Sequence, residues 1–172
     1  MIQAEVLSID EIIKKINSGE IFEAVPVDYS FHLKIRDYIP YVCAAIHAGH
    51  NFRNNLKDKI IHSEYERWYE EDPHTDTFIS SMPLTIFGLD SRFEYDLNRS
   101  PDLCVYKDAW GKPVWKKPLS KTLQKESLKK HANFYKVIDA LIGHIEKKFG
   151  GCLVYDMHSY NFIRHNKELP VF

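Results

Sequence analysis

Two histidines, His47 and His158, follow short apolar runs of the sequence. The run 41–46, YVCAAI, ends directly before His47, and two residues separate the run 152–155, CLVY, from His158. Imidazole is a common zinc ligand, and a catalytic zinc site needs three protein ligands and one open position. Two histidines at strand ends and one carboxylate would meet that need. Spacing alone leaves a simpler interpretation open, in which both rings are hydrogen-bonded loop residues.

The acidic run YEED offers three candidates for the carboxylate: Glu70, Glu71 and Asp72. The alternative is that these acids form a solvated turn. Asp156 stands two residues before His158, and residues two apart share a face of a strand. It is therefore a candidate for orienting the His158 ring through a hydrogen bond to the ring nitrogen that does not face the metal. It could equally cap a turn or pair with a lysine.

The segment DSRFEYDLNRS contains a second group of candidates, Arg92, Asn98 and Arg99. Arginine is a planar, bidentate partner for carboxylate and phosphate groups. Asn98 adds an amide that both donates and accepts. A simpler interpretation for Arg92 is a surface salt bridge within its own segment. The acids available for it are Asp90, Glu94 and Asp96.

Alternating strands and helices are needed to position these groups. A helix is predicted from Ile9, because Ser8 and Glu11 form a capping box, and Gly19 ends it. A longer helix is predicted over about 120–149, with Gly150 after it. Its expected apolar stripe is Leu128, Ala132, Tyr135, Ile138, Leu141, Ile142 and Ile145.

The remaining segments divide into predicted strands and loops. The stretch 21–35 is β-like, and 41–46, 84–89 and 152–155 are apolar runs typical of strands buried on both faces. A further strand is predicted at 93–97, and 51–69 reads as loop. Asp72 and Pro73 could open a short helix. Polar residues follow three of the strands, and ligands bind at the carboxyl ends of strands in open α/β sheets.

Composition excludes several other classes of protein. The 172 residues carry a net charge of −1, with 44% hydrophobic and 27% charged residues, which indicates a globular domain without general attraction to nucleic acid or membranes. The three cysteines form no CxxC motif, so we expect reduced thiols rather than disulfides. No signal peptide or membrane-spanning apolar run is present. We therefore expect a cytoplasmic α/β protein.

Four strings shift the interpretation toward one family. DLNR at 96–99 resembles the DLNR of zinc carboxypeptidases and of succinylglutamate desuccinylase and aspartoacylase, and DMHSYN at 156–161 resembles the carboxypeptidase segment with the third zinc ligand. IHAGH at 46–50 resembles the segment with the first ligand. Together with EEDPHTD before SRFEYDLNR, these strings resemble the N-formylglutamate amidohydrolase family over about residues 41–162.

The resemblance implies one Zn²⁺ ion on a zinc-carboxypeptidase-like (phosphorylase/hydrolase-like) α/β fold, a mixed sheet covered by helices. His47 and His158 would be metal ligands, with Asp156 behind them. Carboxypeptidases have HxxE, whereas the fourth position here is His50. The resemblance therefore favours Glu71 as the third ligand, with Asp72 and His50 as the alternatives.

The resemblance also implies a substrate. Asn98 and Arg99 would hold the carboxylate of an N-acyl amino acid, and Arg92 would polarise the scissile carbonyl. The expected reaction is hydrolysis of an N-acyl, formyl-like amide of a small acidic amino acid such as N-formylglutamate. The alternative is a non-catalytic regulatory module that binds metal and carboxylate on the same fold. Neither hypothesis involves nucleic acid or membrane, and neither fixes the oligomeric state.

Zinc carboxypeptidases place their general-base glutamate on a strand after the third ligand. This sequence ends at Phe172, and its last residues, ELPVF, look like the start of another strand. Glu168 stands too early in the pattern for that role. We therefore expect residues 1–172 to form a single α/β domain, incomplete at its C-terminus, that is the N-terminal part of a longer amidohydrolase domain.

Overall fold

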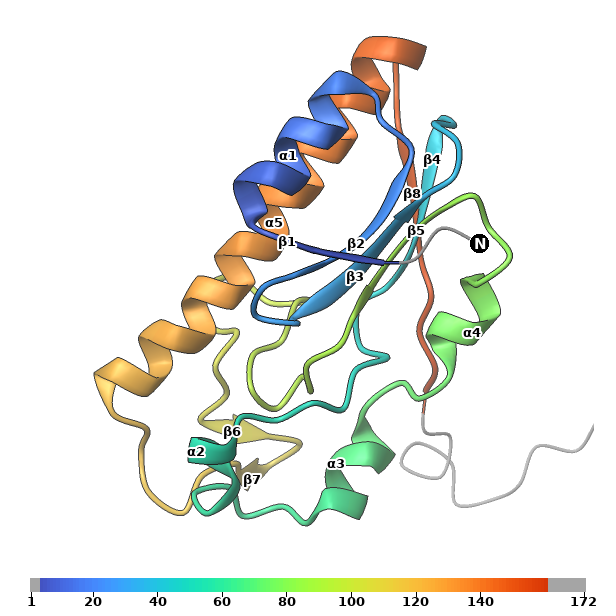
Figure 1. The fold of residues 1–172 in the computed structure, drawn as a ribbon. Helices are drawn as coiled ribbons and strands as arrows, with labels where there is room; N and C mark the ends of the chain where they lie inside the picture. Colours follow the sequence, from blue (N-terminus) through green and yellow to red (C-terminus); the bar gives the residue numbers. More distant parts are fainter. Residues whose placement is uncertain (1–3, 161–172) are drawn as a thin grey trace, which may run out of the picture.

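A six-stranded mixed sheet organises residues 4–160, the part of the chain that the computed structural model describes (Figure 1). The strand order is β1-β2-β3-β5-β4-β8. β3 is antiparallel to both of its neighbours, and the other neighbouring pairs are parallel. The strands are β1 (Glu5–Leu7), β2 (Phe22–Pro26), β3 (Phe31–Ile35), β4 (Tyr41–Ala45), β5 (Leu84–Gly88) and β8 (Leu153–Asp156). The predicted α/β class with a mixed sheet is confirmed.

Five helices and one small hairpin complete the described structure. The helices are α1 (Ile9–Ser18), α2 (Asn54–Lys57), α3 (Glu64–Glu70), α4 (Thr75–Ile79) and α5 (Lys121–Phe149), and the hairpin consists of β6 (Asp108–Ala109) and β7 (Lys112–Pro113). The capping box of Ser8 and Glu11 begins α1, as predicted. Gly19 ends α1 at φ 74°, a left-handed conformation that favours glycine.

The main core lies between the sheet and the helices α1 and α5, which run side by side on one face (Figure 1). Ile12 and Ile16 of α1 and Leu141 and Ile145 of α5 are fully buried there. Neighbouring residues of a strand point to opposite faces, so Cys43 of β4 faces away from this core. It packs with α4, which covers part of the other face.

The carboxyl ends of β4, β5 and β8 lie at one edge of the sheet, because the three strands are parallel. In Figure 1 the chain leaves this edge toward α2, α3 and the hairpin. Gly49 allows the chain after β4 to pass closely over the chain after β5. A Cβ atom at Gly49 would lie 2.3 Å from the backbone carbonyl carbon of Leu89, so a larger residue would force the two segments apart.

The predicted strand at 93–97 is wrong, because this segment forms consecutive turns rather than a ladder. Its alternation of apolar and acidic residues does not separate a core face from a solvent face. Phe93 and Tyr95 are buried, but so are Glu94 and Asp96, each fully. The acids tolerate burial because they are paired with arginines, so both halves of the pattern point inward.

The loop predicted over 51–69 contains the two short helices α2 and α3. The second begins with a capping box that the sequence reading missed, formed by Ser63 and Glu66. The predicted cap of α4 is also wrong, because His74 occupies the N-cap position at φ 68°. Asp72 contributes its backbone carbonyl, which accepts from the Thr75 hydroxyl at 2.7 Å, and its carboxylate remains free for other contacts.

Two predictions about burial need correction. The strand at 152–155 was expected to be buried on both faces, but β8 is exposed along its length because it pairs only with β4 among the described residues. The helix α5 has the predicted extent, but the face that it buries differs from the predicted apolar stripe. Leu141 and Ile145 are buried as predicted, whereas Ala132 and Tyr135 are exposed, since His131 and Phe134 face the core instead.

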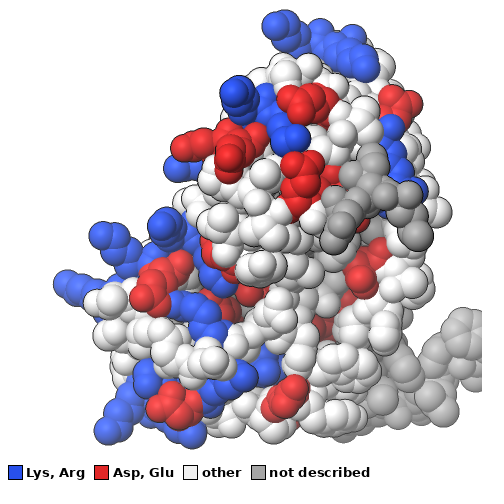
Figure 2. Space-filling view, viewed as in Figure 1, with Lys and Arg blue, Asp and Glu red and all other residues white. Residues whose placement is uncertain are grey.

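Positive and negative side chains are interspersed over the face shown in Figure 2. This matches the balanced composition of the sequence. No helix among residues 4–160 has both the length and the apolar character needed to cross a membrane. Cys43 and Cys104 are buried free thiols, and Cys152 is half-buried and free. The predicted strand start at 168–172 lies outside the described residues.

A buried ionic network fastens α5 to the turn after β5. Lys130 donates to Asp90 at 2.9 Å, and the Tyr95 hydroxyl donates to the same carboxylate oxygen at 2.7 Å. Arg53 binds Glu94 and also reaches Ser127 of α5 at 2.7 Å. The network holds the start of the 90–99 segment against the helix.

The network predicts a pH-dependent stability through Asp90. Burial raises the pKa of Asp90 to about 6, against the opposing pull of Lys130. The folded protein then binds this proton more tightly than the unfolded chain does, so the stability due to Asp90 is lost as pH rises through about 6. Between about pH 4 and pH 7, we expect the unfolding free energy of the wild type to fall relative to Asp90→Asn. The difference should reach at most about 3 kcal/mol.

Urea unfolding at several pH values measures this difference. Asp139→Asn, at an exposed position of α5, is the matched control and should follow the wild type at every pH. Parallel curves for the wild type and Asp90→Asn would contradict the assignment.

Candidate metal centre

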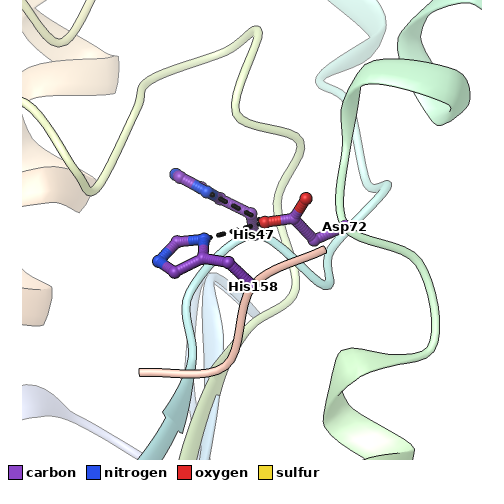
Figure 3. Close-up of side chains that lie close together, drawn as sticks. All are labelled: His47, Asp72 and His158. Atoms are coloured by element: carbon purple, nitrogen blue, oxygen red, sulfur yellow. Dashed lines mark hydrogen bonds and ion pairs between the residues drawn. The ribbon is translucent and has the colours of Figure 1, made fainter. Parts of the chain in front are cut away.

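His47 and His158 meet at the carboxyl edge of the sheet, as the sequence predicts. His47 follows β4 and His158 follows β8, and these strands are parallel neighbours. The ring centroids lie 5.0 Å apart. Asp72, which comes from the turn after α3, points between the two rings (Figure 3). One potential ligand atom from each of the three residues lies within 4.8 Å of the other two, so the group could hold a metal ion.

The backbone places Asp72 at this position. Its amide donates to the carbonyl of His47 at 3.0 Å, which ties the turn after α3 to the end of β4. The Oδ2 atom of Asp72 lies 2.8 Å from Nδ1 of His158 and 3.5 Å from Nδ1 of His47. The other oxygen, Oδ1, accepts from the Ser159 hydroxyl at 3.0 Å. One carboxylate oxygen thus faces both histidines.

The orientation of the His47 ring suits a metal ligand. The ring is buried, and its Nε2 atom binds the Asp96 carboxylate at 2.7 Å. The Nδ1 atom is buried and has no hydrogen-bond partner among the described residues. Histidines that bind metals characteristically present one nitrogen to the ion and donate from the other to a carboxylate. A divalent ion would satisfy this Nδ1 atom, which accepts no hydrogen bond from residues 4–160.

His158 has the same arrangement in a more open position. Its Nε2 atom lies 2.8 Å from the Asp156 carboxylate, and its Nδ1 atom faces Asp72. The side chain is 34% exposed. Asp156 therefore lies where the sequence analysis expected an orienting carboxylate. Both rings turn Nδ1 toward Asp72 and Nε2 toward a second acid.

Asp96 is the most heavily bonded carboxylate around this group. It is fully buried, and its Oδ1 atom binds His47 Nε2 and accepts from the backbone N–H of Asn98, each at 2.7 Å. Its Oδ2 atom accepts from Arg92 Nη2 at 2.8 Å and from the Tyr106 hydroxyl. Burial alone would raise the pKa of Asp96, but His47 and Arg92 stabilise the anion and hold that pKa far below its usual range.

The carboxylates also change the protonation of His47. Burial by itself would lower the pKa of His47, yet the adjoining Asp72 and Asp96 outweigh it and raise that pKa. Asp72 responds in the opposite direction. Burial would raise the pKa of Asp72, and its contacts with His47, His158 and Ser159 lower it below its usual value. The group therefore keeps its acids ionised, as metal ligands must be.

Glu71, the expected third ligand, points away from the two histidines. Its buried carboxylate binds His50 Nδ1 and accepts from the Ser91 hydroxyl. Consecutive residues of this extended turn thus serve two different clusters. The structure brings the alternative, Asp72, to the histidines, while Glu71 and His50 pair with each other.

Arg92 lies beside the centre, with its guanidinium over the ring of Trp110 at 5.4 Å. Its Nη2 atom donates to Asp96 and, at 3.3 Å, to Tyr106. The Arg92–Asp96 pair is one of the salt bridges that the sequence analysis left open. Among residues 4–160, the Nη1 atom makes a single long contact, of 3.5 Å, with the Glu70 carbonyl.

Asn98 and Arg99 follow Asp96 on an exposed turn. Their side chains form no hydrogen bond or ion pair with any residue in the range 4–160. Their backbone is well held, because Asp96 accepts from the Asn98 amide and His131 of α5 binds the Arg99 carbonyl at 2.9 Å. The structure therefore fixes the turn and leaves both side chains available to a ligand.

Sequence reasoning missed two members of this site. Asp96 was considered only as a salt-bridge partner of Arg92, and Tyr106 was not considered at all. The signal for Asp96 was its place at the start of DLNR, two positions before the first of the two residues expected to bind substrate. Tyr106 carries no such signal, because only the folded 97–106 loop returns its hydroxyl to Asp96.

Comparison with known proteins identifies a family for this chain. The sequence model of the N-formylglutamate amidohydrolase family matches residues 39–172, well over half of the chain. The chain belongs to that family. The matched range contains both histidines, Asp72 and the 92–99 segment. Comparisons with curated proteins and with solved structures find no significant match.

Membership in the N-formylglutamate amidohydrolase family confirms the resemblance inferred from the sequence. It also gives the class of reaction, which is hydrolysis of an amide bond in a small molecule.

Neighbouring acids give a direct test of the ligand set. We expect Asp72→Asn to weaken binding of added Zn²⁺ by more than the 10- to 100-fold typical of losing an outer carboxylate, because it removes a ligand. The matched variant Glu71→Gln should keep nearly wild-type zinc affinity. Competition with a chelating dye measures both constants. The reverse order of the two variants would restore Glu71 as the ligand and contradict the assignment of Asp72.

Proposed function

We propose that this member of the N-formylglutamate amidohydrolase family is a zinc-dependent enzyme that cleaves the formyl-like amide of an acidic amino acid such as N-formylglutamate. The observation that carries the proposal is the buried Nδ1 of His47, which has no hydrogen-bond partner in residues 4–160 and faces Asp72 beside Nδ1 of His158. Two imidazoles and one carboxylate with an open position are a typical catalytic zinc ligand set. The family match supports the choice of reaction.

His47, Asp72 and His158 would hold the ion in this proposal. Bound there, it would supply Lewis-acid polarisation of the amide carbonyl and activation of water at neutral pH. Asp96 and Asp156 keep the two rings in the orientation that presents Nδ1. Parallel strands bring the two histidines together and a backbone hydrogen bond holds Asp72 beside them, so little movement would be needed for binding.

Arg99 and Asn98 would hold the substrate carboxylate in this proposal. Both side chains are exposed and without partners in residues 4–160, and their turn is fixed to the same Asp96 oxygen that holds His47. A guanidinium and a carboxamide together match the planar carboxylate of an acyl amino acid. The shared oxygen would keep the bound substrate at a constant position relative to the metal ligands.

Arg92 would stabilise the negative charge that develops on the amide oxygen. Asp96, Tyr106 and Trp110 fix the guanidinium, while the long contact of Nη1 with the Glu70 carbonyl leaves donors that are weakly used. Preorganised donors of this kind contribute most when they face developing charge.

Formate release from N-formylglutamate tests the proposal. Chelator-treated protein should be inactive and should regain turnover with Zn²⁺. His158→Ala removes one of the proposed metal ligands and should lower kcat/KM by at least about 100-fold. A loss of that size corresponds to roughly 2.7 kcal/mol of transition-state stabilisation, because each 1.36 kcal/mol is tenfold. The control His144→Ala changes a half-buried ring near the C-terminal end of α5 and should keep activity. Activity that survives chelation would contradict the proposal, and zinc and ligand binding without turnover would favour the non-catalytic module.

Arg99→Met tests the carboxylate contact separately. We expect KM for N-formylglutamate to rise about tenfold with kcat nearly unchanged, because the contact persists from ground state to transition state. The control Arg36→Met removes an exposed guanidinium at the end of β3 and should change neither constant. A fall in kcat at constant KM would assign Arg99 to the reacting centre instead.

A further inference from the structure

A cavity of about 680 Å³ lies outside the residues of the metal centre, although His50, three residues after His47, lines it. Its walls come from the β2–β3 turn, the segment 50–53, the segment 57–63 and the helix α3. The described residues that line it do not include His47, Asp72 or His158. Its size suits a small molecule.

Arg67 of α3 places an unsatisfied guanidinium at this cavity. Only 8% of its side chain is exposed, and the guanidinium lies over the ring of Phe52 at 4.4 Å. Its Nη1 atom is buried without a hydrogen-bond partner in residues 4–160. The same atom is 3.7 Å from Glu71, a distance that allows an ion pair but not a hydrogen bond. Nη1 of Arg67 is therefore a buried charged donor without a hydrogen-bond acceptor in the described structure.

Glu71 does not satisfy Arg67, because both of its oxygens are already engaged. Oε2 binds His50 Nδ1, and Oε1 accepts from the Ser91 hydroxyl. A buried charged donor without an acceptor is costly, and a guanidinium is best satisfied by a planar, bidentate acceptor. The geometry thus leaves a place for an acceptor from outside the described chain.

The acids that line the cavity have other partners. Asp90 binds Lys130 and Tyr95, and Asp28 accepts from the Ser30 hydroxyl at 2.6 Å. Glu64 is 82% exposed and lies 3.4 Å from His50 Nε2. These carboxylates leave Arg67 unsatisfied, yet their charge disfavours a doubly charged ligand such as phosphate.

We propose that this cavity binds a carboxylate group of a small molecule through the Arg67 guanidinium. The carboxylate belongs either to a free organic acid or to the far end of a substrate whose amide reaches the metal centre. Phe52 holds the guanidinium plane, so the ligand meets a preformed fork. The site does not depend on the proposed hydrolytic activity, because none of the metal-centre residues forms it.

Metal-free protein tests the site without involving catalysis. We expect titration with acetate or glutarate to shift the Arg67 Nε–H resonance in the wild type until it saturates. Inorganic phosphate at the same pH should bind more weakly. A resonance that does not move, or tighter binding of phosphate than of acetate, would overturn the proposal.

Variants separate the site from general charge effects. Arg67→Met should weaken glutarate binding at least about tenfold, which corresponds to 1.4 kcal/mol. Arg36→Met, which removes an exposed guanidinium, should leave binding unchanged. Because Arg67 is buried, thermal unfolding must show that the variant is folded, and the wild-type resonance test stands even where it is not. Equal weakening by both variants would contradict a specific site.

Zinc distinguishes the two sources of the carboxylate. If the group belongs to the substrate, N-formylglutamate should shift Arg67 more strongly in zinc-loaded than in metal-free protein, while acetate should not respond to zinc. If it belongs to a free acid, both should bind independently of zinc. Glutarate binding that appears only with zinc would place the carboxylate at the metal and contradict the proposed site.

Discussion

The buried carboxylate of Asp96 is the interaction on which the site depends. A fully buried anion is costly unless it is paired and hydrogen-bonded, and Asp96 receives contacts on both oxygens. One oxygen connects the His47 ring to the turn that carries Asn98. The other connects Arg92 to Tyr106. A single side chain thus couples a candidate metal ligand to the residues proposed to bind substrate.

The sheet supplies the second half of the arrangement. Parallel pairing of β4 and β8 brings His47 and His158 together at one edge, although they are far apart in the sequence. The backbone contact between Asp72 and the His47 carbonyl then adds the carboxylate from the turn between α3 and α4, which lies outside the sheet. Strand register and one loop hydrogen bond therefore position the three side chains.

The sequence predicted those parts of the structure in which local pattern and packing agree. The capped helix α1, the extent of α5 and the strands β4 and β5 followed from periodicity and capping residues. The two histidines could be paired because each follows an apolar run. The segment 93–97 could not be predicted, because its acids are buried in ion pairs, Asp96 with nearby Arg92 and Glu94 with Arg53 from a distant position. Alternation alone cannot distinguish solvent from a buried ion pair.

The choice between Glu71 and Asp72 depended on a further detail of the same kind. The two residues are adjacent acids, and only the fold decides which one faces the histidines. Asp72 does so because its amide binds the end of β4, and Glu71 is drawn to His50 and Ser91. The exposure of β8 was also beyond the sequence pattern, since the apolar run gives no sign of its place beside a single described neighbour.

Anomalous diffraction at the zinc edge, from crystals of the protein grown with Zn²⁺, tests the central claim most directly. The account predicts one strong peak within coordination distance of Nδ1 of His47, Nδ1 of His158 and Oδ2 of Asp72, with Asp96 still bound to His47 Nε2. A peak at Glu71 and His50, or a zinc-soaked crystal with no peak between the two imidazoles, would contradict it.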